Sequence, residues 1–304
     1  MRIPDARRAV PGSSWRRLPA GLLWTAPWWL GFLFFLAVPL GASLYLSFCD
    51  YTLLQPPAFI GWANYLSLAS DADFGKVVFN TLVYSLLAVP LGAIVAVALA
   101  LLLNRTARGQ AFFRACVFLP TIVPLTAAAM VWMWMLNPQA GLVNEPFRWA
   151  GMSPPNWFDR PAWAMAALVL ISLWFVGSPT VIYLAGLQEI PLELYEAAEL
   201  DGASPWGRFR NVTLPGLGPV VLFNVIIAIL TAWQIFALPY ILWRTQKGPD
   251  GATYFYAMYI YDAAFRDLRM GYASAMAWVQ LLIILLMTGL VFWIGRRTVH
   301  YRGA

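Results

Sequence analysis

The chain has 304 residues, of which 61% are hydrophobic and only 11% are charged. A soluble globular domain usually carries about 25% charged residues, so this composition, with a mean hydropathy of +0.66, excludes an ordinary soluble domain. It predicts a membrane protein with several spans. The net charge of +6 would also suit nucleic acid, but the positions of the basic residues indicate a membrane topology and no nucleic-acid partner.

Residues 1–21 are basic and contain Pro4, Pro11 and Pro19, which predicts a cytoplasmic N-terminal tail. Arginines before an apolar run are also typical of a signal peptide. The run that follows is too long for the apolar region of a signal peptide and has no clear A-x-A cleavage site. An uncleaved first span is the preferred interpretation.

Six apolar segments are each longer than the ~20 residues that a helix needs to cross a bilayer. None of them contains Asp, Glu, Lys or Arg. Because lipid cannot hydrogen-bond an open backbone, the spans are expected to be helices, and residues 22–295 are predicted to form an all-α polytopic membrane domain. The predicted spans are Leu22–Phe48, Val77–Leu103, Ala115–Leu136, Ala162–Leu187, Pro219–Trp243 and Tyr272–Gly295.

The basic residues set the predicted orientation. If the N-terminus is cytoplasmic, inner segments hold thirteen of the twenty basic residues. This bias predicts that both termini are cytoplasmic, with a C-terminal tail over residues 296–304. The thirteen are Arg2, Arg7, Arg8, Arg16, Arg17, Arg105, Arg108, Arg114, Arg208, Arg210, Arg296, Arg297 and Arg302.

Proline and cysteine add two expectations about the early spans. Pro120 and Pro124 remove two backbone donors near the start of the third span, which predicts a bend there. Cys49 and Cys116 fall at opposite sides of the bilayer and are too far apart to form a disulfide.

A polar segment, Gln188–Gly218, separates the fourth and fifth spans on the predicted cytoplasmic side. Pro191 suits the first turn of a short helix and Gly202 the left-handed residue that ends it. Ser204 and Pro205 are typical of the start of a second helix, which Pro215 is expected to end. Five of the fourteen acidic residues lie here: Glu189, Glu193, Glu196, Glu199 and Asp201.

This segment resembles the EAA loop of the integral-membrane subunits of ABC importers. The matching residues are Glu196-Ala197-Ala198, Asp201-Gly202-Ala203, Trp206, Phe209, Val212 and Leu214-Pro215. In that family the loop docks into a groove on the ATP-binding subunit and transmits its closure. The resemblance implies that these are ATPase-coupling residues and that the chain has the type I ABC importer permease fold. A plain amphipathic cytoplasmic loop is the alternative that a lone EAA would favour.

Other motifs extend the resemblance over nearly the whole chain. Residues 59–65, FIGWANY, and the run from Phe118 to Asn144 are similar to motifs of the carbohydrate branch of these permeases, which includes maltose and glycerol 3-phosphate importers. Residues 259–265 and 270–275 continue the pattern. The Gly248-Pro249 pair departs from the Gly-Gly-Pro usual there.

The resemblance also implies partners and a location. These are a second homologous permease, two ATP-binding cassette subunits, an extracytoplasmic solute-binding protein and the lipid of a bacterial or archaeal cytoplasmic membrane. The chain itself lacks the G-x-x-x-x-G-K-[ST] motif, and its two lysines, Lys76 and Lys247, fall on the outer side. His300 is its one histidine and cannot form a metal site alone. We therefore expect a non-catalytic subunit without a cofactor or metal, and expect ATP and Mg²⁺ on the partner ATPases.

The fifth span offers candidate pathway residues. Its polar side chains are Asn224, Thr231 and Gln234. At 100° per residue, Thr231 lies about 20° and Gln234 about 80° from Asn224, so the three share a face. Trp233 and Phe236 flank that face and could stack against a sugar ring. The alternative is that Asn224 and Thr231 only join this helix to a neighbour.

Two other functions are possible for a chain with several spans. An ion-coupled secondary transporter usually keeps an ionisable residue within its spans, and this sequence has none there. A non-transporting scaffold would not need the acidic helix pair. Charge-free spans suit a neutral sugar or polyol, although Arg244, Lys247 and Arg266 at the outer mouth could select an anion such as a glycerophosphate.

Overall fold

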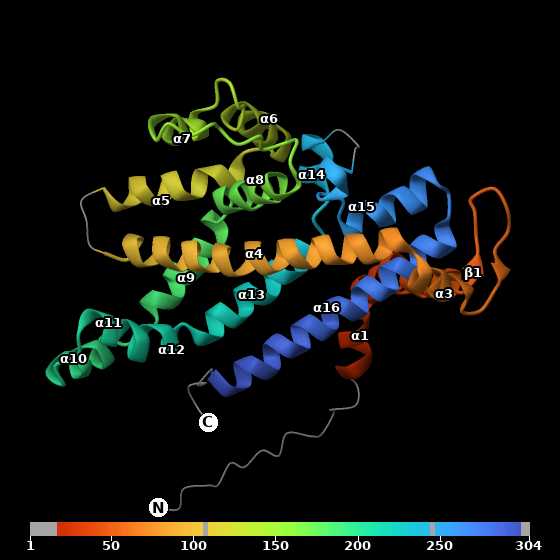
Figure 1. Ribbon diagram of the computed structural model, residues 1–304. Helices are drawn as coiled ribbons and strands as arrows, with labels where there is room; N and C mark the ends of the chain where they lie inside the picture. The colour runs from red at the N-terminus through yellow and green to blue at the C-terminus, as the bar shows by residue number, and fades with distance from the viewer. Residues whose placement is uncertain (1–16, 106–108, 244–246, 299–304) are drawn as a thin grey trace, which may run out of the picture.

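The structure, a computed structural model, describes residues 17–105, 109–243 and 247–298 (Figure 1). Most of the predicted N-terminal tail, the end of the C-terminal tail with His300, and Arg108 and Arg244 lie outside the described residues. The first helix, α1, spans Arg17–Phe32 and begins five residues before the predicted span. It continues through the π turn η2 (Leu33–Ala37) into α2 (Val38–Ser47).

The predicted count of six spans agrees with the helices. Four are long and apolar enough to cross a membrane singly: Trp24–Leu46, Ala72–Leu103, Gly218–Leu242 and Met270–Arg296. The third and fourth predicted spans are bent pairs of helices, and counting each pair as one span gives six. Long, charge-free apolar runs form these helices because every backbone group is then satisfied inside the segment.

The bend predicted in the third span is nearly a right angle. Helix α5 (Gln110–Phe118) passes into the 3₁₀ turn η3 (Leu119–Ile122) and then into α6 (Leu125–Met135), with 101° between the helices. Pro120 and Pro124 lie at this break, where each lacks the amide that a continuous helix needs.

The fourth span bends by 50° between α8 (Pro161–Trp174) and α9 (Gly177–Gln188), which the sequence reading did not anticipate. Gly177 begins α9 where the third span approaches closely: a Cβ added there would lie 2.5 Å from the carbonyl oxygen of Val117. Pro179 occupies the first turn of α9, a position that proline tolerates.

The fifth span is also interrupted, although one helix was predicted. Helix α13 (Gly218–Trp233) ends before α14 (Ala237–Leu242), and residues 234–236 between them are not helical. Pro239 explains the break, because its ring blocks the hydrogen bond to the carbonyl four residues earlier. The Gln280 side chain donates a 2.6 Å hydrogen bond to the Trp233 carbonyl, which satisfies a group that the helix end leaves unpaired.

The long helices α4 (Ala72–Leu103) and α16 (Met270–Thr298) organise the molecule. Helix α4 packs against α8, α9 and α13, and α16 packs against α2 and α13. The end of α4, the polar segment and the end of α16 lie at one end of the molecule, and α3 (Ala63–Ser70) and α15 (Tyr256–Tyr261) lie at the other (Figure 1). The segments at the first end are among those predicted to be cytoplasmic, and α3 and α15 are in loops predicted to lie outside.

The described residues depart from the all-α prediction only in a two-residue antiparallel pairing. Strand β1 (Cys49–Asp50) pairs with β2 (Ala58–Phe59) beyond the first span. Cys49 is buried there, whereas Cys116 is exposed in α5, and both thiols are free as expected. Short helical pieces complete the outer loops: η4 (Leu142–Asn144), α7 (Glu145–Trp149), η6 (Pro249–Gly251) and the π turn η7 (Asp262–Arg266).

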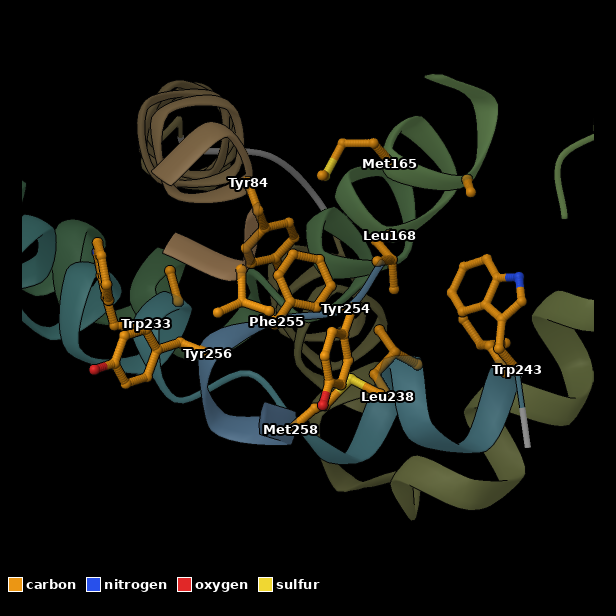
Figure 2. Close-up of a cluster of buried hydrophobic side chains, with 14 of the residues drawn as sticks. Tyr84, Met165, Leu168, Trp233, Leu238, Trp243, Tyr254, Phe255, Tyr256 and Met258 are labelled. Atoms are coloured by element: carbon orange, nitrogen blue, oxygen red, sulfur yellow. The ribbon is translucent and has the colours of Figure 1, made fainter. Parts of the chain in front are cut away.

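An aromatic core fixes the outer half of the bundle (Figure 2). Phe255 and Tyr256 are fully buried, and Phe255 packs edge-on against Tyr84 of α4, with 5.5 Å between ring centroids. Thr81 accepts a hydrogen bond from the Tyr256 amide at 3.0 Å. The loop before α15 is therefore held rigidly against α4, beside the break in the fifth span.

Asp71 joins three elements at the outer end. It caps α4 by accepting hydrogen bonds from the amides of Asp73 and Phe74. Tyr259 and Tyr272 also donate their hydroxyls to its Oδ2 atom, the latter at 2.5 Å. Burial by itself would raise the pKa of Asp71, but these four donors outweigh it and hold the pKa below its usual value.

We expect Asp71→Asn to lower thermal stability near neutral pH. Hydrogen bonds to a charged group contribute about 1.5–3 kcal/mol. Because the folded-state pKa is depressed, the carboxylate stabilises the protein above the unfolded pKa of about 3.9, and this contribution is lost as the pH falls through the folded pKa. Melting curves of the detergent-solubilised protein should therefore converge on acidification. The exposed Asp159 provides the control, and equal losses in Asp71→Asn and Asp159→Asn would contradict the role of Asp71.

Candidate functional site

The polar segment folds as two short helices in a hairpin. Helix α10 (Leu192–Leu200) is followed by a turn over residues 201–204 and then by α11 (Pro205–Arg208). The hydroxyls of Tyr195 and Thr213 are 3.0 Å apart and join the two arms. Arg208 forms a 3.2 Å ion pair with the exposed Glu199. We call residues 188–218 the coupling unit.

Gly202 sets the turn of the coupling unit. Its φ angle is +74°, the left-handed conformation expected from the sequence. The Gly202 amide bonds the Glu199 carbonyl at 3.0 Å, and the Ala203 amide bonds the Ala198 carbonyl at 2.9 Å. This pair of bonds is the Schellman ending of a helix, which favours glycine because a Cβ is strained at positive φ.

The start of the second helix also agrees with the sequence. The Ser204 hydroxyl accepts a hydrogen bond from the Gly207 amide, and Pro205 occupies the first turn. The expected end at Pro215 falls one residue early, because the backbone continues through the π turn η5 (Phe209–Thr213) into α12 (Leu214–Gly216) and ends there. Pro215 lies in the first turn of α12, a position that proline tolerates.

The proposed coupling residues form an exposed surface rather than a core. Glu196, Ala197, Asp201 and Gly202 are exposed, and Ala198 is half-buried. Trp206 is 69% exposed and stacks on Phe209, with 5.3 Å between ring centroids. Leu214 is exposed and Pro215 half-buried. The exposed leucines of α10, which the sequence motif does not include, lie on more than one face of that helix: Leu192, Leu194 and Leu200.

A cavity of about 560 Å³ lies beside the broken fifth span. Helices α4, α9 and α13 and the end of α8 contribute to its walls, and the break at residues 234–236 forms part of its lining. Among the described residues that line it, none is charged. The cavity is thus mostly apolar with a few polar groups, as sites for small molecules usually are.

The structure brings four of the five candidate pathway residues to this cavity. Asn224, Thr231, Gln234 and Phe236 all line it. Asn224 and Thr231 each donate a 2.9 Å hydrogen bond to the carbonyl four residues earlier in their own helix. The side chain of Gln234 is exposed and has no hydrogen bond to the described residues.

Trp233 does not belong to this wall. It is 1% exposed and packs against Tyr256 with 6.1 Å between ring centroids, in the aromatic core of Figure 2. The helix places it 100° from its neighbour Gln234, so the two side chains face different surroundings. The expectation that Trp233 supplies a stacking surface for a sugar is therefore wrong, whereas Phe236 remains available.

The sequence reading missed the wall opposite the fifth span. Tyr84 of α4 and Tyr183 of α9 both line the cavity. Tyr183 is 1% exposed, and its hydroxyl has no hydrogen-bond partner among the described residues. Polar side chains within the second and fourth spans were the available signal, but their facing direction depends on how the spans pack.

Known proteins share this fold and much of this sequence. The family model described as "Binding-protein-dependent transport system inner membrane component" matches residues 88–300. The chain is 36% identical over 284 residues to the probable ABC transporter permease protein YesP of Bacillus subtilis. The aligned region covers 93% of this chain and 92% of YesP. The chain is also 36% identical over 241 residues to the trehalose/maltose transport system permease protein MalF of Thermococcus litoralis, covering 79% and 81%.

A third relative is the sulfoquinovosyl glycerol transport system permease protein SmoG of Agrobacterium fabrum, 35% identical over 82% of each chain. Among solved structures, a bacterial ABC transporter involved in the import of the acidic polysaccharide alginate superimposes with a TM-score of 0.76 at 24% identity. The match covers 94% of this chain and 99% of that one, which shows a shared fold. The chain therefore belongs to the family of binding-protein-dependent transport system inner membrane components, and it is a multi-pass membrane protein with the type I ABC importer permease fold.

Proposed function

We propose that this chain is a permease subunit of an ATP-driven importer for a sugar or related polyol. It forms half of the translocation pathway in the cytoplasmic membrane and carries no catalytic residue. A second homologous permease, two ATP-binding cassette subunits and an extracytoplasmic solute-binding protein complete the assembly. ATP and Mg²⁺ bind the ATPase subunits, and this chain holds no cofactor.

The uncharged cavity beside the broken fifth span is the observation that carries this proposal. Interrupting a helix within a membrane is costly unless the freed backbone is buried in protein or lines a cavity. Here the break at residues 234–236 adjoins the cavity, and Gln234 turns a polar side chain toward it without a partner among the described residues. A hydroxyl-rich, neutral solute would supply that partner.

The charges at the outer mouth also favour a neutral solute. Lys247 forms a 2.8 Å ion pair with Asp73, and Arg266 forms a 3.2 Å ion pair with Asp262. Paired basic residues attract an anion less than free ones, because the neighbouring carboxylates compensate their charge. Arg244 lies outside the described residues. The printed names of two relatives refer to trehalose and maltose and to sulfoquinovosyl glycerol, which agrees with a sugar or sugar derivative as the cargo class and does not bear on its charge.

The coupling unit provides the proposed link to ATP hydrolysis. Its leucines and Trp206 are exposed at one end of the molecule (Figure 1). Large apolar side chains that several neighbouring segments expose are typical of a protein-binding surface. The Tyr195–Thr213 contact makes the hairpin a firm body, so a movement of the docked ATPase can be passed to α9 and α13, which flank it.

The direct test is reconstitution of the complete complex in proteoliposomes. We expect ATP-dependent uptake of a neutral sugar that requires the solute-binding protein, with ATP hydrolysis stimulated by the loaded binding protein. Purification of the chain with a P-loop ATPase would support the assembly. Uptake driven by an ion gradient without ATP would instead identify a secondary transporter, and the proposal would be wrong.

Glu196→Lys should weaken the ATPase contact. Glu196 is exposed on α10. A carboxylate on a docking helix is expected to meet a basic or hydrogen-bonding group of the ATPase. Lysine reverses the charge, so attraction to a basic group would become repulsion. We expect at least tenfold less ATPase to co-purify, or an ATPase that stays bound but is no longer stimulated. Asp159→Lys makes the same charge change in an outer loop and provides the control. Unchanged assembly and transport in Glu196→Lys would refute the docking assignment.

A further inference from the structure

Four aromatic rings lie in contact between the cavity and the outer end of the molecule. Phe236 and Tyr240 stack with 5.0 Å between centroids. Tyr261, at the end of α15, lies 5.1 Å from Phe236 and 5.9 Å from Tyr240. Phe265, in the π turn η7, lies 5.2 Å from Tyr261. We call Phe236, Tyr240, Tyr261 and Phe265 the aromatic ladder.

The aromatic ladder connects two different environments. At one end Phe236 lines the 560 Å³ cavity. At the other end Phe265 is 62% exposed, and α15 lies at the end of the molecule opposite the coupling unit (Figure 1). Tyr261 joins Phe236 to Phe265, and Tyr240 packs against Phe236 and Tyr261. Both tyrosines are half-buried. The ladder therefore forms a continuous aromatic surface from the proposed pathway to the side where a solute would arrive.

Neighbouring tyrosines have structural hydrogen bonds that the ladder tyrosines lack. Tyr254 donates its hydroxyl to Asp262 at 2.8 Å, Tyr256 donates to the Met276 carbonyl at 2.8 Å, and Tyr259 donates to Asp71. No hydrogen bond joins the hydroxyl of Tyr240 or Tyr261 to any residue that the structure describes. The nearby aromatic residues thus divide into a bonded core and a half-open ladder.

We propose that the aromatic ladder binds the faces of sugar rings as they pass from the outer surface into the cavity. An aromatic face carries negative partial charge, and the C–H groups on one face of a sugar ring carry positive partial charge and are apolar. Stacking on successive rings needs no fixed hydroxyl pattern, which suits a track that must release its ligand. The Asp262–Arg266 pair beside the outer rung offers partners for sugar hydroxyls.

This inference rests on the proposed function for its ligand class, a sugar. It adds a route from the outer end of the molecule to the cavity that uses rings outside the fifth span as well as within it. Phe236 lies in the break before α14, and the other three rings come from α14, α15 and η7, outside the polar face of α13. An apolar segment of a partner protein is the competing occupant. A flat aromatic face is required for sugar stacking, whereas any bulky apolar side chain would serve a protein contact.

The test compares Tyr261→Leu and Phe265→Leu with the wild-type complex in proteoliposomes. Leucine keeps apolar bulk but removes the ring face. We expect initial sugar uptake per assembled complex to fall about tenfold in each, the factor that corresponds to one lost aromatic contact. The conservative Tyr261→Phe keeps the face and should restore most of the uptake. Phe223→Leu changes an exposed aromatic residue of α13 that lies outside the ladder and is the matched control.

The outcomes separate this inference from the proposed function. If the wild-type complex transports sugar and both leucine variants match it, the ladder inference is wrong while the function stands. If uptake falls only in proportion to lost binding of the solute-binding protein or second permease, the ladder is a protein contact and the inference is also wrong. Because Phe265 is largely exposed, Phe265→Leu remains informative even if Tyr261→Leu fails to assemble.

Discussion

Gly202→Val is expected to abolish solute-stimulated ATP hydrolysis while leaving membrane insertion intact. Gly202 has a φ angle of +74° between α10 and α11, and a left-handed backbone costs a residue with a Cβ about 1–2 kcal/mol. A β-branched side chain is especially unfavourable at positive φ. The turn should therefore shift, and the exposed surface around Trp206 should no longer match the ATPase.

The open space around Gly202 shows whether a substitution there would act through backbone strain or through a steric clash. A Cβ added at Gly202 meets nothing within 4 Å in this chain, so the penalty within the chain comes from the backbone conformation. Gly202→Asn is the informative comparison, because asparagine tolerates left-handed φ and should keep most of the stimulation. Gly207→Ala is a second control, since its Cβ would make only ordinary contacts at 3.5–3.6 Å. Wild-type stimulation in Gly202→Val would remove this turn from the mechanism.

Features that depend on local sequence were predictable. The spans could be located because their apolar runs are long and carry no charge. The Gly202 turn and the Ser204 cap were predicted because each depends on a conformational preference of a single residue. The bend near Pro120 and Pro124 was predicted for the same reason, but its angle of 101° depends on neighbouring helices and could not be.

Features that depend on packing between distant segments were not predictable. The break before Gly177 depends on the close approach of Val117. Trp233 was assigned to the pathway because it adjoins Gln234 in sequence, but contact with Tyr256 buries it in the core. Most of the surface of a membrane helix is apolar, so the sequence gives little indication of which apolar face meets lipid, protein or a cavity.

Gln234→Ala should lower solute transport at least tenfold per assembled complex, or change its selectivity, without loss of thermal stability. Gln234 lines the cavity and has no hydrogen bond from its side chain to the described residues. Alanine therefore breaks no described contact, whereas a solute that bonds the amide would lose a partner. When a site hydrogen-bonds its ligand, removing one partner of that bond strongly weakens the preference for the ligand.

Gln280→Ala is the matched control, because it makes the same chemical change in the same layer of the bundle. The Gln280 amide bonds the Trp233 carbonyl at 2.6 Å where the fifth span breaks, so its removal leaves a buried carbonyl unpaired, which costs about 1–3 kcal/mol. We expect Gln280→Ala to lower the melting temperature of the complex, and Gln234→Ala to leave it unchanged.

If Gln234→Ala instead melts earlier and transports normally per assembled complex, the polar face of the fifth span is structural. The cavity would then lose the polar side chain on which its assigned role rests, because Asn224 and Thr231 each already donate a hydrogen bond to their own helix.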